Sequence, residues 1–248
     1  RVRSAVIRRP NRTEMAPLMT AGRHLLLRVG SMLAVFGGAT AIAARIDEPT
    51  LAAHQIAMSM FLFLALSLDA LAIPAQTLVA EDLGRDDRPA AAHVAARAAR
   101  LSAITGVGLG VILAAVALWL PLLFTDDRLV VDRAAGALWW LAVLLAPGAI
   151  AFAHDGSLIG AGDYRFLGRA AFGYLLAVVP IAVVVLALPR FGIAGIWAGL
   201  LAWMTLRALV NHHRTKIVLG NPPRSPTTSR HSRVTVCFCR ARRLPVSC

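Results

Sequence analysis

Charged residues are scarce in this sequence of 248 amino acids. Asp, Glu, Lys and Arg together make up 16% of the chain, whereas an average soluble domain has roughly 25%. Hydrophobic residues make up 58%, and the mean hydropathy is +0.66. This composition argues against a water-soluble fold and points to a membrane protein.

Cysteine is also scarce, and Cys237, Cys239 and Cys248 all lie near the C-terminal end. These three residues cannot form a disulfide framework or a four-ligand zinc site by themselves. The sequence has no nucleophile elbow, phosphate-binding loop, His-Glu-x-x-His motif or pair of carboxylates with catalytic spacing. We therefore expect no enzymatic activity, no metal site and no cofactor other than a coupling proton or sodium ion.

Six long apolar stretches dominate the chain. Most of them reach the ~20 residues that a helix needs to cross the hydrocarbon core of a bilayer. They lie at about 25–45, 52–80, 101–124, 134–160, 170–188 and 193–213. Because they are longer than the strands of a membrane barrel and apolar on all sides, we predict an all-α bundle of six transmembrane spans over residues 24–213.

Three segments differ from these spans. Residues 1–23 are polar and basic, and we predict a cytoplasmic arm there. Residues 87–100 are rich in Ala and Arg, which is typical of an amphipathic helix that lies along the membrane interface. From about residue 218 the composition changes to Pro, Ser, Thr and Arg, which cannot bury enough apolar surface to fold. We therefore predict a disordered basic tail over residues 218–248.

The positive charges are distributed unevenly along the chain. Of the 26 Lys and Arg residues, 22 lie in the N-terminal arm with the start of the first span, the second and fourth loops and the C-terminal region, and 4 lie in the other loops. The positive-inside rule therefore predicts a multi-pass protein of the plasma membrane with both termini in the cytoplasm. Topology accounts for most of the net charge of +13, so we expect the lipid bilayer as a partner and no nucleic acid.

Asp69 lies inside the second predicted span, where a carboxylate costs about 3 kcal/mol and needs a compensating partner. Gln55, Asp69 and Gln76 are separated by multiples of seven residues, which places them along one slowly drifting stripe of a helix. We expect this stripe to face the interior of the bundle. Two roles remain open for Asp69: binding of a proton or cation, or a structural hydrogen bond to a neighbouring helix.

Asp155 lies near the predicted cytoplasmic end of the fourth span. The glycines that follow it, Gly156, Gly160 and Gly162, permit close approach of two helices or a broken helix of the kind that lines transporter cavities. Asp155 is therefore the second candidate for substrate or ion binding, with a place at the membrane interface as the alternative. We expect His154 to be its hydrogen-bonding neighbour.

Arg28 and Arg207 lie close to predicted cytoplasmic ends of spans. Long basic side chains at such places commonly extend to the lipid head groups, and we expect the same of these two. Pairing with a buried carboxylate is the alternative.

Two segments of the sequence carry a resemblance to a known family. The first runs from Ala52-Ala53-His54-Gln55-Ile56-Ala57 to Asp69-Ala70-Leu71-Ala72-Ile73-Pro74-Ala75-Gln76-Thr77-Leu78-Val79-Ala80, and the second is Asp155-Gly156-Ser157-Leu158-Ile159-Gly160-Ala161-Gly162-Asp163. Both resemble the MATE (multidrug and toxic compound extrusion) family, especially its DinF-like branch. The second segment is similar to the glycine-rich end of the tenth helix in that family.

The resemblance, which covers roughly residues 24–213, implies one lobe of a larger fold. MATE transporters have twelve helices in two lobes, and they export drugs and organic cations in exchange for protons or sodium ions. By this resemblance the chain is the second lobe, Asp69 is the coupling acid, and Gln55 and Gln76 line the cavity. A first lobe, or a second chain, and a small organic substrate are then the expected partners.

Two other functions remain open at this point. A related transporter that flips lipid-linked saccharides uses a similar lobe, and a strongly cationic central cavity would favour it because its cargo carries phosphate. A non-transporting membrane scaffold or a truncated remnant is the other alternative.

Overall fold

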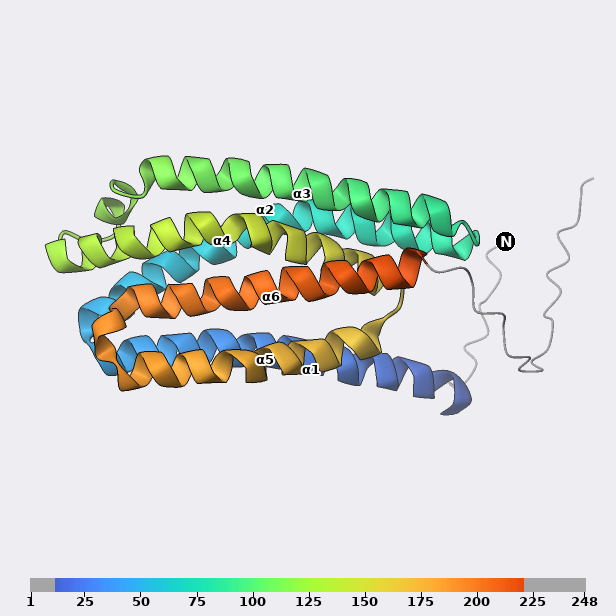
Figure 1. The fold of residues 1–248 in the computed structure, drawn as a ribbon, viewed down its shortest axis with the longest axis horizontal. Helices are drawn as coiled ribbons and strands as arrows, with labels where there is room; N and C mark the ends of the chain where they lie inside the picture. Colours follow the sequence, from blue (N-terminus) through green and yellow to red (C-terminus); the bar gives the residue numbers. More distant parts are fainter. Residues whose placement is uncertain (1–11, 221–248) are drawn as a thin grey trace, which may run out of the picture.

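The computed structural model describes residues 12–220, and these residues form six long α-helices and two short 3₁₀ helices without a β-strand (Figure 1). The helices are α1 (Arg12–Ile46), α2 (Glu48–Gly84), α3 (Arg88–Val116), η1 (Leu120–Leu123), α4 (Arg128–Gly160), α5 (Tyr164–Ala187), η2 (Pro189–Phe191) and α6 (Gly192–Gly220). Each of the six α-helices is long and apolar enough to cross a membrane. The predicted all-α bundle of six spans is confirmed.

The helices extend beyond several of the predicted limits. α1 begins at Arg12, inside the predicted arm at 1–23, and α6 continues to Gly220, past the start of the predicted tail at 218–248. The rest of that arm and tail, with all three cysteines, lies outside the described residues.

The stretch at 87–100, which we predicted as an amphipathic helix along the interface, is not an element of its own. Residues from Arg88 onward form the first half of α3. Ala91 and Ala95 are buried there in a small cluster with Val79 of α2 and Leu219 of α6. The alanines of this stretch allow α3 to pack closely on its neighbours, so the stretch belongs to a helix of the bundle.

α4 is the central helix of the bundle. It packs against α2, α3 and α6, while α1 packs mainly on α5 (Figure 1). α1 and α2 adjoin at the turn around Asp47 and diverge toward their other ends (Figure 1). The bundle therefore has α1 and α5 packed together on one side and α2 and α4 packed together on the other.

Glycines of α4 bring it close to α2, as the small-residue pattern predicts. A Cβ atom on Gly156 would lie 2.6 Å from the carbonyl oxygen of Ala72, and a Cβ atom on Gly160 would collide with the carbonyl of Gln76. Only glycine fits at these two positions without a shift of the backbone.

We expect Gly156→Ala to lower the free energy of unfolding by about 1–3 kcal/mol, because the new methyl group meets backbone and not a flexible side chain. Gly136→Ala is the matched control in the same helix, since nothing lies within 4 Å of its Cβ position. Alanine there should be neutral or should stabilise the helix by up to about 1 kcal/mol. Thermal unfolding in detergent measures both, and equal effects of the two variants would contradict the close packing.

The turn between α1 and α2 is tied to α4 by a charged contact. The Asp47 carboxylate caps α2 by accepting a hydrogen bond from the backbone N–H of Thr50 over 2.8 Å. Arg133 of α4 donates to the same carboxylate and, over 2.6 Å, to Oγ1 of Thr50. Desolvation raises the pKa of Asp47, but the hydrogen bonds from Thr50 and Arg133 and the charge of Arg133 outweigh it, so the pKa lies below its ordinary value.

This lowered pKa predicts a pH dependence of stability. Ionised Asp47 stabilises the fold above its unfolded pKa of roughly 4, and the contribution is lost as the pH falls through the lower, folded pKa. Asp47→Asn keeps a good capping residue and removes this titration. Below about pH 4 the melting temperature of the unaltered chain should therefore fall more steeply than that of the variant. Parallel curves would show that Asp47 makes no such contribution.

Candidate functional site

Asp155 is the centre of a buried polar network that joins four helices. It lies on α4 and is 3% exposed. Its Oδ2 accepts hydrogen bonds from Arg28 of α1 and Arg207 of α6, and its Oδ1 accepts one from Nδ2 of Asn211 over 2.5 Å. The hydroxyl of Tyr174 on α5 donates to Oδ1 of Asn211 over 2.9 Å. We call these five residues the Asp155 network.

The network satisfies charges that the apolar bundle would otherwise exclude. An isolated buried charge is costly, whereas an ion pair with further hydrogen bonds offsets much of the desolvation. The guanidinium of Arg207 also lies over the rings of Trp203 and Phe152, at 5.6 and 5.5 Å from their centroids. Such cation–π contacts are favourable when water is excluded.

The expectation that Arg28 and Arg207 extend to the lipid head groups is wrong. Both pair with Asp155, and the side chain of Arg207 is 4% exposed. A carboxylate buried between helices needs a cation close by, and this need outweighs the tendency of arginine to reach the membrane surface.

The expected hydrogen bond between His154 and Asp155 is also absent from the described contacts. His154 lies 2.9 Å from His212 through Nε2 and Nδ1. Neighbouring residues of an α-helix point about 100° apart, so His154 and Asp155 face different partners.

Sequence reasoning did not find Asn211 and Tyr174. Asn211 lies four residues after Arg207, and residues with this spacing share one face of a helix. A basic residue and an amide at that spacing, inside an apolar span, were the available signal. Tyr174 had no comparable signal.

Asp69 lies beside the Asp155 network without a direct partner in it. The residue is half-buried on α2, and its electrostatic neighbours are Arg28, Asp155 and Arg207. No hydrogen bond or ion pair to Asp69 is present within residues 12–220. Arg28 and Asp69 lie on α1 and α2, the two helices that diverge (Figure 1).

The predicted stripe of Gln55, Asp69 and Gln76 faces the interior only in part. Asp69 and Gln76 are half-buried, but Gln55 is exposed. The packed face of α2 is formed by neighbouring positions such as Leu68, Ala72 and Ala75, most of them small, which allow α4 to approach. The polar stripe therefore runs along the side of this packed face.

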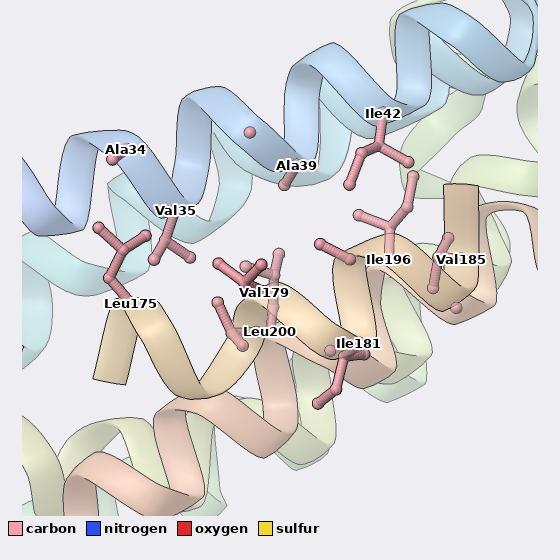
Figure 2. A pocket seen from close by; sticks show the side chains of 15 residues that line it. Ala34, Val35, Ala39, Ile42, Leu175, Val179, Ile181, Val185, Ile196 and Leu200 are labelled. Carbon is pink, nitrogen blue, oxygen red and sulfur yellow. The ribbon is translucent and has the colours of Figure 1, made fainter. Parts of the chain in front are cut away.

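An apolar cavity of the described chain is separate from these charges. It lies between α1, α5 and α6, has a volume of about 140 Å³, and is lined by apolar residues and glycine. Figure 2 shows Val35 and Ala39 of α1 beside Val179 of α5 and Leu200 of α6 around it. Since this lining has no charged side chain, the Asp155 network with Asp69 is the better candidate for ion or substrate binding.

The charges of this candidate site are mixed. Two arginines and two aspartates lie near one another within the helical bundle. Within the described residues, no group of three His, Cys, Asp or Glu side chains is placed to hold a metal ion. The arrangement offers a carboxylate for a proton or a cation and a guanidinium for an anionic group.

The fold and this site define a class, the multi-pass membrane proteins that have ion pairs buried between their helices. The model of the MatE family matches residues 31–184, and the chain belongs to this family. MATE proteins are transporters and not enzymes.

Known relatives match the chain over most of its length. Protein DETOXIFICATION 44, chloroplastic, of Arabidopsis thaliana is 32% identical over 79% of this chain and 37% of its own length. DNA damage-inducible protein F of Escherichia coli (strain K12) is 24% identical over 77% of this chain and 41% of its own length. The crystal structure of MATE in complex with MaL6 has a TM-score of 0.76 and 15% identity, and it covers 86% of this chain.

The chain is thus similar to one part of larger proteins. It spans about two fifths of these two curated relatives and 49% of the solved structure. The resemblance of one six-helix lobe to the MATE family and its DinF-like branch is confirmed.

We expect Asp155→Asn to destabilise the chain by about 3–5 kcal/mol, because two buried or half-buried arginines lose their anion. Glu81→Gln is the control, since Glu81 pairs with Arg85 and both side chains are exposed. Loss of such a surface pair costs about 0–1 kcal/mol. The two variants are compared by thermal unfolding in detergent, and a small effect at Asp155 would contradict the buried network.

Proposed function

We propose that this chain is the second lobe of an efflux transporter that exports small organic compounds by antiport, in exchange for protons or sodium ions. Membership of the MATE family supports the transport function. The observation that carries the coupling proposal is that Asp69 has no hydrogen bond or ion pair within residues 12–220, next to the fully paired Asp155. A carboxylate without a fixed partner is free to bind and release a cation.

Asp69 is the coupling acid in this proposal, and Asp155 is the second candidate. Two guanidiniums and the amide of Asn211 already occupy both oxygens of Asp155. An incoming cation would have to displace them, whereas Asp69 presents no such competition. Exchange then requires that the ion and the cargo bind the inward-open and outward-open states with different affinities.

The two glutamines serve as polar lining of the transport path in this proposal. Gln76 is half-buried and Gln55 is exposed, and both lie on the side of α2 that carries Asp69. A polar side of a membrane helix is costly against lipid, which favours contact with water, cargo or a first lobe.

The proposed setting is the plasma membrane, with both termini in the cytoplasm. The distribution of 22 and 4 basic residues on the two sides supports this orientation. A first lobe, in the same protein or in a second chain, is the proposed partner, because this chain matches about half of the solved relative.

A flippase of lipid-linked saccharides is a weaker candidate. Its phosphate-bearing cargo calls for a strongly cationic cavity, and the site here has two charges of each sign. If no transport is measured, the chain is instead a membrane scaffold or a remnant that does not transport.

The coupling proposal is tested with Asp69→Asn in a drug-sensitive, efflux-deficient host that expresses the full reading frame. Efflux driven by an imposed proton or sodium gradient should fall about tenfold or more, because the uncharged amide of the variant cannot bind and release the coupling ion. Asp86→Asn is the matched control on the exposed loop after α2, where φ is 60° and Asn is well tolerated. Undiminished gradient-driven efflux in Asp69→Asn would reject Asp69 as the coupling acid.

A further inference from the structure

The Asp155 network contains more positive than negative charge. Arg28 and Arg207 both donate to Oδ2 of the one carboxylate. A one-to-one pair would be neutral, so one positive charge remains without an anion in contact. Asp69 balances this charge through space but makes no ion pair with either arginine, so guanidinium donors remain at which a further anion can bind.

Of the two arginines, Arg28 is the one whose guanidinium can bind a second anion. Arg207 is held by Asp155 and by two aromatic rings, and its side chain is 4% exposed. The side chain of Arg28 is 17% exposed, and Asp155 is its one hydrogen-bond partner among residues 12–220. A guanidinium has five N–H donors in a planar fork, so Arg28 can hold Asp155 with one edge and a second anion with another.

Asp69 does not fill this place. It acts on Arg28 through space, but the two side chains are not in ion-pair contact. They lie on α1 and α2, the diverging helices (Figure 1), and their opposite charges interact without contact. The cavity beside Arg28 and Asp155 measures about 10 Å³, which is room for about one water molecule. A larger group therefore reaches Arg28 from its exposed side.

We propose that Arg28 is a specificity-determining residue that binds an anionic group, a carboxylate or a phosphate, on the exported compound. This inference rests on the proposed efflux function. It narrows the exported compounds to those that carry a negative charge. A compound that also carries a positive charge can place that charge next to Asp69. Asp155 acts as the internal ligand that positions the guanidinium. Exchange of an ion at Asp69 and capture of the anionic group at Arg28 are then separate events.

The test uses two rhodamine dyes that differ by one group: one has a free benzoic acid, and the other is its methyl ester. Both are titrated by fluorescence anisotropy against the purified chain in phosphatidylcholine nanodiscs. Arg28→Gln should weaken binding of the acid dye about tenfold or more, as expected for loss of a charge-assisted contact. Binding of the ester should stay within about twofold. Arg45→Gln, an exposed position on the same helix, should leave both affinities unchanged.

A purely structural role of Arg28 gives a different result. Arg28→Gln leaves Asp155 paired with Arg207 and Asn211, so the melting temperature should change little. If Arg28 serves only to neutralise Asp155, the melting temperature falls and both dyes are weakened alike, which overturns the proposal. Arg28→Lys, which keeps the charge, should retain part of the preference for the acid. Free benzoate should displace the acid dye, but not the ester, from the unaltered chain, a result that does not depend on any variant.

Two further outcomes separate this inference from the proposals on which it rests. If acid and ester bind equally while cells show efflux, the anion site is wrong and the transport proposal stands. If Arg28 discriminates the dyes but cells show no efflux, the site stands and the transport proposal is wrong.

Nanodiscs that contain phosphatidylglycerol test whether the anion at Arg28 comes from a lipid. If phosphatidylglycerol weakens acid-dye binding only when Arg28 is present, a lipid phosphate is the ligand, and the assignment to cargo is overturned.

Discussion

The pairing of the buried Asp155 carboxylate with Arg207 is the interaction on which the rest of this structure depends. Asp155 on α4 holds Arg28 on α1 and Arg207 on α6, so three helices meet around one charge. Helix association in a membrane gains little from the hydrophobic effect, and polar contacts and close packing therefore matter more. The rotation of α1, α4 and α6 about their axes is restricted by this contact.

Glycine packing positions the second acid beside the first. Gly156 follows Asp155 directly, and its backbone lies against Ala72 of α2. Ala72 is three residues from Asp69, about one helical turn. The contact that joins α2 to α4 thus also brings Asp69 into the electrostatic field of the arginines. Fold stability and the candidate coupling site share the same few residues.

Composition and the length of apolar stretches were enough to predict six spans and the helical class. They could not predict how each helix is rotated, because a span that is apolar on all sides has no strong periodic signal. Gln55 and Asp69 therefore share a predicted stripe but differ in burial. The same limit hid the partners of Asp155: whether Arg28 reaches the surface or a carboxylate depends on which helix faces it.

The central claim is that Asp155 and Arg207 interact directly inside the membrane bundle. A double-mutant cycle measures this interaction through the unfolding of Asp155→Asn, Arg207→Gln and the double variant in detergent. The structure predicts a coupling energy of about 2 kcal/mol or more, with the double variant less destabilised than the sum of the single variants. Additive effects of the two substitutions would contradict the ion pair and the site built on it.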